Sequence, residues 1–280
     1  MNFEHVLVVG AGQMGGGIAQ VLAASGRRVS LHDAAPGAVE RGLAAMGKSL
    51  ERLAAKGAEI EPGDVLGRIE AAGGIVPADL MIEAVVEDQA VKEEIFREAD
   101  SVLPPDAILA SNTSSIPIAS LAASTSRPDK VIGMHFFNPV PVMALVEVVS
   151  TKETSAETRA AVVALAQELG KTPAEANDLP GFVSNRILLP FINEAAWALH
   201  DGVAEPDAID TIAKLGFNHP MGPLALADLI GLDTCVAILE VLRDGLGDER
   251  YEPCPLLREH VAAGRLGRKS GAGFYSYESP

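Results

Sequence analysis

Cysteine, aromatic side chains and positive charge are all scarce in this sequence. Its two cysteines, Cys235 and Cys254, cannot form a disulfide framework and lack metal-ligand spacing, so we expect reduced thiols and no metal site. Aromatic residues make up 4% of the 280 residues, which leaves the core to Ala, Val, Leu and Ile. Hydrophobic residues reach 48%, which is ample for such a core.

Charge and hydropathy exclude two classes of partner. The net charge is −16, whereas a nucleic-acid partner requires a positive surface. No run of about 18 uncharged apolar residues occurs, so we predict no membrane span. The first residues have no basic flank and no cleavage site, so we expect no signal peptide and a cytoplasmic protein.

Short apolar runs alternate with amphipathic stretches over the first part of the chain. The runs that read as strands are Val6–Val9, Val29–His32, Leu80–Val85, Ala107–Ala110, Val131–Phe137 and Leu145–Val149. The stretches that read as helices are Gly15–Ala24, Ala38–Lys56, Gln89–Val102, Ser120–Ser124 and Ala156–Gly170. Continuous apolar strands separated by helices predict an α/β fold, a doubly wound and mainly parallel sheet of the Rossmann type.

The pattern changes near residue 180. Asn177–Gly181 reads as a linker, and no convincing strand follows it. The later segments with helical periodicity are Val183–Asp201, Pro206–Leu215, Leu224–Leu242 and Leu256–Ala263. We therefore predict two domains, residues 1–179 with the sheet and an all-helical C-terminal domain at residues 180–280.

A glycine-rich turn lies between the first predicted strand and the first predicted helix. It is the segment Gly10-Ala11-Gly12-Gln13-Met14-Gly15. The first glycine permits a tight turn, the second lets the backbone approach a pyrophosphate, and the third allows close helix–strand packing. This context predicts a dinucleotide site, although the turn alone does not distinguish NAD from FAD.

Asp33 follows directly after the second predicted strand, about 20 residues beyond the turn. An acid at this position accepts hydrogen bonds from the adenine ribose and repels a 2′-phosphate, so NAD is favoured over NADP. The alternative is a structural glycine turn with a surface aspartate.

One histidine and one glutamate stand out in the last two predicted strands of the sheet. His135 is in the C-terminal half of its strand, at the end where doubly wound sheets bind ligands. Glu147 lies inside an apolar run, which is costly for an unpaired carboxylate. The two are equally far from Pro141, so in a hairpin they face one another, and a carboxylate on one imidazole nitrogen suits a general base. A buried ion pair without catalytic role fits the spacing equally well.

Polar residues also follow the fourth predicted strand. Asn112-Thr113-Ser114-Ser115 can hold a substrate oxygen or a nicotinamide, or can simply form a turn rich in side-chain hydrogen bonds.

Together, these segments resemble the 3-hydroxyacyl-CoA dehydrogenase family. The motifs that carry the resemblance are Gly10–Gly15, Ser111–Ser115, His135–Pro141, Ile82–Glu87, Pro180–Arg186, His219–Pro223 and Gly267–Tyr275. The resemblance covers essentially the whole chain. It implies an NAD-dependent enzyme that oxidises the 3-hydroxyl of a short-chain acyl-CoA thioester, with a helical domain that forms a homodimer.

The resemblance also implies roles for single residues. His135 would be the general base, oriented by Glu147, while Ser114 and Asn185 would hydrogen-bond the reacting oxygen. The positions that match cofactor contacts are the glycine turn, Asp33, Glu87, Lys92, Asn112, Ser114 and Asn138. The positions that match contacts with CoA are Ser49, Lys56 and Lys92. Arg41, Lys48 and Arg52 lie on the same predicted helix, as a cationic patch for CoA phosphates or as a solvated face.

Some positions depart from the family pattern. Ala144 replaces the usual Lys, Ser184 the usual Val and Asp88 the usual Asn, and the segment between Lys56 and Glu83 is shorter. These departures leave open a thioester on acyl carrier protein or a free 3-hydroxy acid as the substrate. A non-enzymatic NAD-sensing protein is the remaining alternative, because a fold alone does not prove a function.

Overall fold

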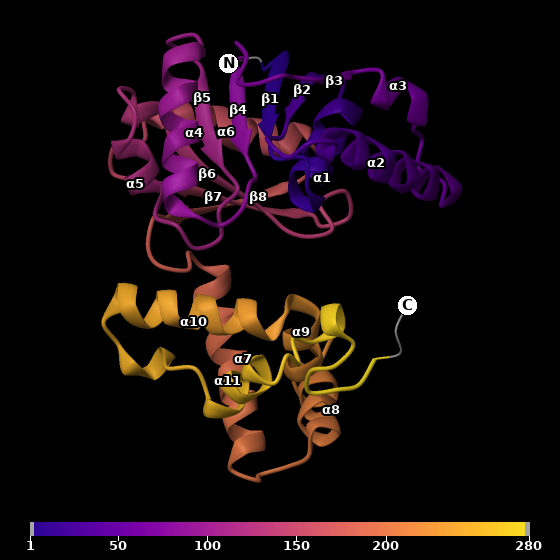
Figure 1. The fold of residues 1–280 in the computed structure, drawn as a ribbon, viewed down its shortest axis with the longest axis vertical. Helices are drawn as coiled ribbons and strands as arrows, with labels where there is room; N and C mark the ends of the chain where they lie inside the picture. Colours follow the sequence, from indigo (N-terminus) through magenta and orange to yellow (C-terminus); the bar gives the residue numbers. More distant parts are fainter. Residues whose placement is uncertain (1–2, 278–280) are drawn as a thin grey trace. The chain divides into compact units, whose positions relative to one another are not determined.

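The computed structural model describes residues 3–277 (Figure 1). Met1 and Asn2, on which the expectation of no signal peptide partly depends, and residues 278–280 lie outside that range. Within it, eight strands form one sheet. The strands are β1 (His5–Val9), β2 (Arg28–His32), β3 (Ile69–Ala71), β4 (Leu80–Glu83), β5 (Ile108–Ser111), β6 (Val131–Phe136), β7 (Leu145–Ser150) and β8 (Thr172–Asn177).

The sheet has the order β3-β2-β1-β4-β5-β6-β7-β8. Neighbouring strands run parallel except for β6 and β7, which are antiparallel. The chain leaves β1 toward β2 on one side and returns to β4 on the other, so the direction of winding reverses between β1 and β4. This reversal confirms the predicted doubly wound fold, and it is the place where such sheets bind ligands.

Helices cover both faces of the sheet. Those of the first part are α1 (Gln13–Ala24), α2 (Ala38–Ala55), α3 (Pro62–Leu66), α4 (Gln89–Val102), α5 (Ile118–Ala123) and α6 (Ala156–Glu168), with the 3-10 turn η1 (Pro128–Lys130). Side chains of α1, α2 and α6 share one apolar cluster with the sheet, whereas α4 and α5 contact β4, β5 and β6. The central strands are therefore buried on both faces, which explains their continuous apolar sequences.

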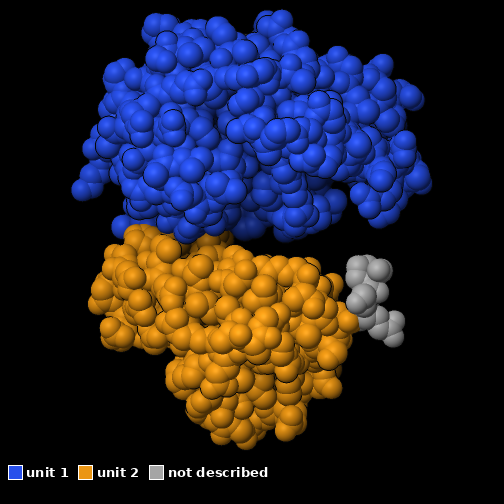
Figure 2. All heavy atoms as spheres, in the orientation of Figure 1, with its two compact units in different colours: residues 1–179 blue, residues 180–280 orange. Residues whose placement is uncertain are grey.

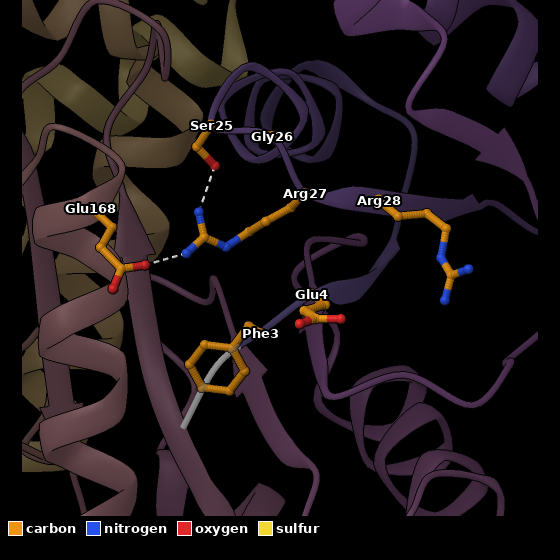
Figure 3. Close-up of a pocket in the computed structure, with 7 residues that line it drawn as sticks. All are labelled: Phe3, Glu4, Ser25, Gly26, Arg27, Arg28 and Glu168. Atoms are coloured by element: carbon orange, nitrogen blue, oxygen red, sulfur yellow. Dashed lines mark hydrogen bonds and ion pairs between the residues drawn. The ribbon is translucent and has the colours of Figure 1, made fainter.

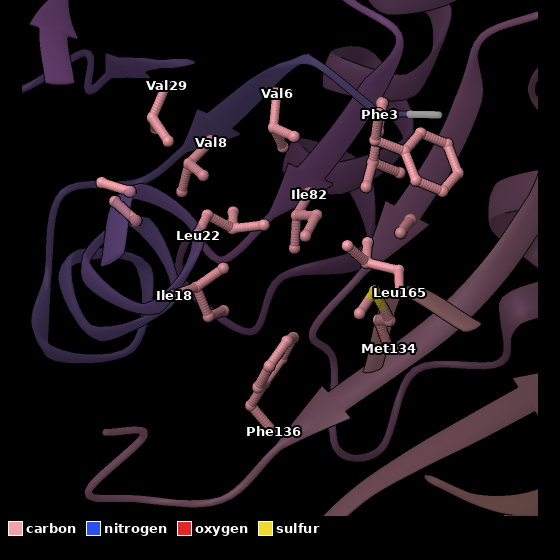
Figure 4. Close-up of a cluster of buried hydrophobic side chains, with 14 of the residues drawn as sticks. Phe3, Val6, Val8, Ile18, Leu22, Val29, Ile82, Met134, Phe136 and Leu165 are labelled. Atoms are coloured by element: carbon pink, nitrogen blue, oxygen red, sulfur yellow. The ribbon is translucent and has the colours of Figure 1, made fainter. Parts of the chain in front are cut away.

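Figure 4 shows the apolar cluster between α1 and the sheet. Ile18 and Leu22, one helical turn apart, point toward Val6 and Val8 of β1 and Ile82 of β4. All five side chains have no exposed surface. This packing fixes the start of α1 against the carboxyl end of β1, where the glycine turn lies.

The chain divides into two compact units, Met1–Leu179 and Pro180–Pro280, which Figure 2 colours separately. The second unit contains α7 (Ser184–His200), α8 (Pro206–Gly216), α9 (Pro223–Ile230), α10 (Leu232–Leu246) and α11 (Pro255–Ala262), with the 3-10 turns η2 (Glu249–Tyr251) and η3 (Arg268–Ser270). Its own core includes Leu189 and Ile192 of α7, Leu239 of α10 and Leu257 of α11, all without exposed surface.

The structure corrects several details of the sequence analysis. Leu224–Leu242 is not one helix, because Gly231 has a φ of 106° and separates α9 from α10. The strands β3 and β8 and the short helix α3 were not predicted. Asn177, assigned to the linker, is the last residue of β8. Between Phe3 and Tyr277, no helix has both the length and the apolar character needed to cross a membrane.

Candidate active site

The glycine turn joins β1 to α1 at the point where the winding reverses. Gly10 has a φ of 104°, and a Cβ there would lie 2.4 Å from the carbonyl oxygen of Ala84. A Cβ on Gly15 would lie 1.9 Å from the carbonyl oxygen of Gly10. Both positions therefore exclude every other residue, as the predicted fingerprint requires.

A cleft of about 710 Å³ opens beside this turn. The predicted residues that line it are Ala11, Gly12, Gln13, Asp33, Ser49 and Asn138, together with Arg41 and Arg52 of the predicted cationic patch. A Cβ on Gly12 would meet no atom within 4 Å, and no side chain caps the start of α1. Uncapped N–H groups and open space beside Gly12 are what a bound pyrophosphate needs, so these residues fit a dinucleotide. Met14 differs, because its side chain packs against the core.

Asp33 is tied to the turn by a hydrogen bond. Its Oδ2 accepts from the backbone nitrogen of Ala11 at 2.8 Å, and its Oδ1 accepts from the backbone nitrogen of Ala35 at 2.8 Å. The carboxylate is thereby held at the edge of the cleft, in the position expected for an acid that binds a ribose.

His135 and Glu147 face one another across the β6–β7 hairpin, as predicted. They are partners in the antiparallel register, and Nδ1 of His135 lies 2.8 Å from Oε2 of Glu147. Their side chains are only 11% and 4% exposed. The ring of Phe137 lies 4.7 Å from the imidazole, centroid to centroid. A carboxylate in this position holds the proton on Nδ1 and orients the ring, leaving Nε2 as the basic nitrogen.

The polar turn after β5 is anchored by Glu87. Oε1 of Glu87 accepts from the hydroxyl of Thr113 at 2.6 Å, from the backbone nitrogens of Ser114 and Ser115 at 3.0 Å each, and from the Ser115 hydroxyl at 2.9 Å. Burial would raise the pKa of Glu87, but the ammonium of Lys92 and these hydrogen bonds outweigh it and lower that pKa. Glu87 thus stays charged and shapes the turn.

A second link joins this turn to the strand that carries the histidine. Oδ1 of Asn112 accepts a hydrogen bond from the backbone nitrogen of Phe136 at 2.8 Å. Asn112, directly after β5, is thereby tied to the residue that follows His135 on β6. Asp88, the departure next to Glu87, caps α4 by accepting from the backbone nitrogen of Val91 at 3.1 Å.

A buried ion pair beneath the turn was not predicted. Nζ of Lys92 lies 2.5 Å from Oε1 of Glu83 and 3.3 Å from Oε2 of Glu87, and Lys92 is 1% exposed. Oε2 of Glu83 also accepts from the Ser111 hydroxyl at 2.6 Å. Glu83 lies within the apolar run Leu80–Val85, so the signal that singled out Glu147, a carboxylate in an apolar run, also applied to it.

The remaining predicted residues occupy separate places. Ser49 lines the cleft beside the glycine turn, whereas Lys56 is exposed just beyond the end of α2 and does not line it. Lys92 faces the two carboxylates, and its contact with CoA stays a prediction. Asn185 is 8% exposed at the start of α7 in the second unit. Among residues 3–277 no cluster of His, Cys, Asp and Glu could hold a metal ion.

Another cavity, of about 660 Å³, lies near the amino ends of β1 and β2 (Figure 3). Arg27 reaches across it to the carboxylate of Glu168 and to the hydroxyl of Ser25. None of the predicted site residues lines this cavity. Because α/β sheets of this type bind ligands at the carboxyl ends of their strands, the cleft beside the glycine turn is the better candidate.

Comparison with known proteins identifies two family models along the chain. The model for the NAD binding domain of 3-hydroxyacyl-CoA dehydrogenase matches residues 5–179, and the model for the C-terminal domain of the same enzyme matches residues 181–277.

Individual relatives match over nearly their whole length. The chain is 56% identical to a probable 3-hydroxybutyryl-CoA dehydrogenase of Bacillus subtilis, over 99% of both chains. It is 49% identical to the 3-hydroxybutyryl-CoA dehydrogenase of Bradyrhizobium diazoefficiens, over 98% of this chain and 95% of that one. The crystal structure of (S)-3-hydroxybutyryl-CoA dehydrogenase from Ralstonia eutropha superposes with a TM-score of 0.95 at 49% identity, over 99% of this chain and 100% of that one.

Proposed function

The chain belongs to the 3-hydroxyacyl-CoA dehydrogenase family, and we propose that within this NAD-dependent activity His135 and Glu147 form the base that deprotonates the substrate alcohol. The observation that carries the proposal is the 2.8 Å contact between His135 Nδ1 and Glu147 Oε2, on a nearly buried hairpin of the sheet. We further propose a short acyl chain, with 3-hydroxybutyryl-CoA as the preferred substrate, because the relatives described above carry that name.

The residues of the first unit have distinct tasks in this mechanism. Nε2 of His135 takes the proton of the 3-hydroxyl, and Glu147 stabilises the imidazolium that forms. NAD held at the glycine turn would supply the acceptor for the hydride that leaves the carbinol carbon as His135 removes the hydroxyl proton, and the alcohol would thereby become a ketone. Ser114 donates a hydrogen bond to the reacting oxygen from the turn that Glu87 anchors. The glycine turn holds the pyrophosphate of the cofactor, and Asp33 holds its adenine ribose.

Several assignments beyond the His135–Glu147 pair complete the proposal. Asn138, Asn112, Glu87 and Lys92 shape the nicotinamide end of the cofactor site, and Ser49 and Lys56 contact CoA. Asn185 supplies a further hydrogen bond to the substrate. We also propose that the first unit is the NAD-binding domain and the second the domain for substrate and dimerisation, and that the enzyme acts in the cytoplasm.

The second unit supports the homodimer. Ile187, Leu215 and Phe217 are 68%, 82% and 61% exposed, and large apolar side chains with so much exposed surface are typical of protein interfaces. Sedimentation of a dimer at micromolar concentration is the expected result. A monomer under those conditions contradicts this part of the proposal.

Turnover with defined substrates tests the function itself. Purified enzyme mixed with acetoacetyl-CoA and NADH should consume NADH, which is measured as a decrease in NADH absorbance. Acetoacetate and acetoacetyl carrier protein serve as matched comparisons, and both should be poorer substrates. Tight NADH binding without turnover of acetoacetyl-CoA would contradict the proposal, and faster turnover of either comparison would identify a different substrate class.

A further inference from the structure

The loop between β6 and β7 connects the two residues of the proposed base. Asn138, Pro139, Val140 and Pro141 of this loop line the cleft beside the glycine turn. The loop therefore forms one wall of the proposed cofactor site as well as the link from His135 to Glu147. A loop whose shape is fixed before the cofactor arrives favours tight binding, since ordering a loop on binding costs affinity.

Val140 attaches this loop to the helix that starts at the glycine turn. The side chain of Val140 is 2% exposed and belongs to the core cluster of the first unit. A Cβ added to Gly17 of α1 would lie 2.8 Å from the Cβ of Val140, so the loop approaches the helix as closely as a glycine permits. Apolar packing alone, however, leaves the backbone carbonyls of the loop to be satisfied.

Lys171, between α6 and β8, is the hydrogen-bond donor for two of these loop carbonyls. Its ammonium donates to the carbonyl oxygen of Val140 at 2.7 Å and to that of Met143 at 2.8 Å. Lys171 is 8% exposed, and within residues 3–277 no carboxylate forms an ion pair with it. Burial lowers the pKa of this lysine, because desolvation disfavours the charged form. Burying an ammonium costs free energy unless hydrogen bonds replace its lost hydration, and the two carbonyl oxygens supply such bonds.

We propose that Lys171 is a positioning residue of the enzyme, which clamps the carbonyls of Val140 and Met143 and thereby holds the β6–β7 loop in the shape that binds NAD. The inference rests on the proposed location of NAD in the cleft beside the glycine turn. Lys171 does not line that cleft, so it acts through the loop and not on the cofactor itself.

Hydrogen exchange and cofactor binding test this role together. The backbone nitrogens of Val142 and Met143 both donate to the carbonyl oxygen of Pro139 at 2.9 Å, so their exchange reports on the order of the loop. In Lys171→Met, which removes the ammonium but keeps the side-chain length, we expect these amides to exchange roughly tenfold faster or more. The Kd for NADH should rise by roughly tenfold, whereas kcat at saturating NADH changes by less than about threefold.

Two further variants separate positioning from general stability. Lys171→Arg keeps a cation with several donors and should restore much of the NADH affinity. Lys152→Met, at an exposed lysine after β7, is the matched control and should behave as the wild type. If Lys171→Met does not fold, Lys171→Gln, which retains donor groups without the charge, takes its place in the same two measurements.

The outcomes are distinct from those of the turnover assay. A lower Tm with unchanged loop exchange and unchanged NADH affinity would overturn the inference, because it assigns Lys171 a purely structural role. Binding of NADH alone is measured, so the result does not depend on whether acetoacetyl-CoA is the substrate.

Discussion

Asp33 and Ala11 are joined by a 2.8 Å hydrogen bond from the backbone nitrogen of Ala11 to Oδ2 of Asp33. The bond connects the end of β2 to the glycine turn and fixes a negative charge at the edge of the cleft. Each carboxylate oxygen has a second lone pair, so the same group can still accept from a ribose hydroxyl. The relationship links the fold to the choice of cofactor.

Asp33→Asn tests that choice. The amide keeps the shape of the side chain but removes the charge that repels a 2′-phosphate. We expect the ratio of kcat/KM with NADPH to that with NADH to rise by roughly tenfold or more. Both values are measured with acetoacetyl-CoA as the second substrate. Asp64→Asn, at an exposed acid on α3, is the control, and an equal ratio in the two variants would show that Asp33 does not select the cofactor.

Gly12→Ala examines the approach of the pyrophosphate. A Cβ at Gly12 meets no protein atom within 4 Å, so the variant should unfold at the wild-type Tm. The methyl group nevertheless occupies the space proposed for the phosphates, and the Kd for NADH should rise by roughly tenfold or more. Gly63→Ala, also in open space, leaves both quantities unchanged. A wild-type Kd for NADH in Gly12→Ala would show that the pyrophosphate does not bind against this turn.

The buried ion pair predicts a strongly non-additive pair of substitutions. Lys92→Met leaves the carboxylate of Glu83, which has no exposed surface, without its cation and should lower the free energy of unfolding by about 3–5 kcal/mol. Combining Lys92→Met with Glu83→Gln removes both charges and should recover part of that loss. Urea unfolding of the single and double variants measures the difference. Additive losses would show that the pair is not energetically coupled.

Glu87 predicts a pH dependence of stability. Folding lowers the pKa of this carboxyl group, so its charged form stabilises the folded enzyme fully above the unfolded value of about 4.3. That contribution is lost as the pH falls through the lower pKa of the folded state. As the pH falls from about 5 to about 3, the free energy of unfolding of Glu87→Gln should therefore decrease less steeply than that of the wild type. Parallel curves from urea unfolding at several pH values would contradict this expectation.

The sequence predicted most of the sheet because its central strands are buried on both faces. A short continuous apolar run such as Leu80–Val85, between two amphipathic segments, is typical of a parallel strand that is covered on both faces. The strands β3 and β8 lie at the two edges and are short or polar, as in Thr172–Asn177, so they gave no such signal. The division of Leu224–Leu242 into two helices depends on the φ of Gly231, which helical periodicity does not report.

The hairpin pair was predictable for a different reason. Antiparallel register is symmetric about a turn, so the equal spacing of His135 and Glu147 from Pro141 predicts that they lie opposite one another, as the register shows. The contacts of Lys92 with Glu83, and of Lys171 with two backbone carbonyls, depend on how long side chains cross between elements. Residue spacing contains no information about such contacts, so these parts of the site came only from the structure.

The kcat of Glu147→Gln with acetoacetyl-CoA and NADH tests the central claim, that a carboxylate-supported His135 is the catalytic base. We expect kcat to fall by about 10²-fold or more while the Kd for NADH stays within about twofold, because the amide cannot stabilise the imidazolium. In a His135→Gln background the same substitution should change kcat little, since the two residues act as one unit. A Glu147→Gln enzyme with a kcat close to that of the wild type would contradict the account.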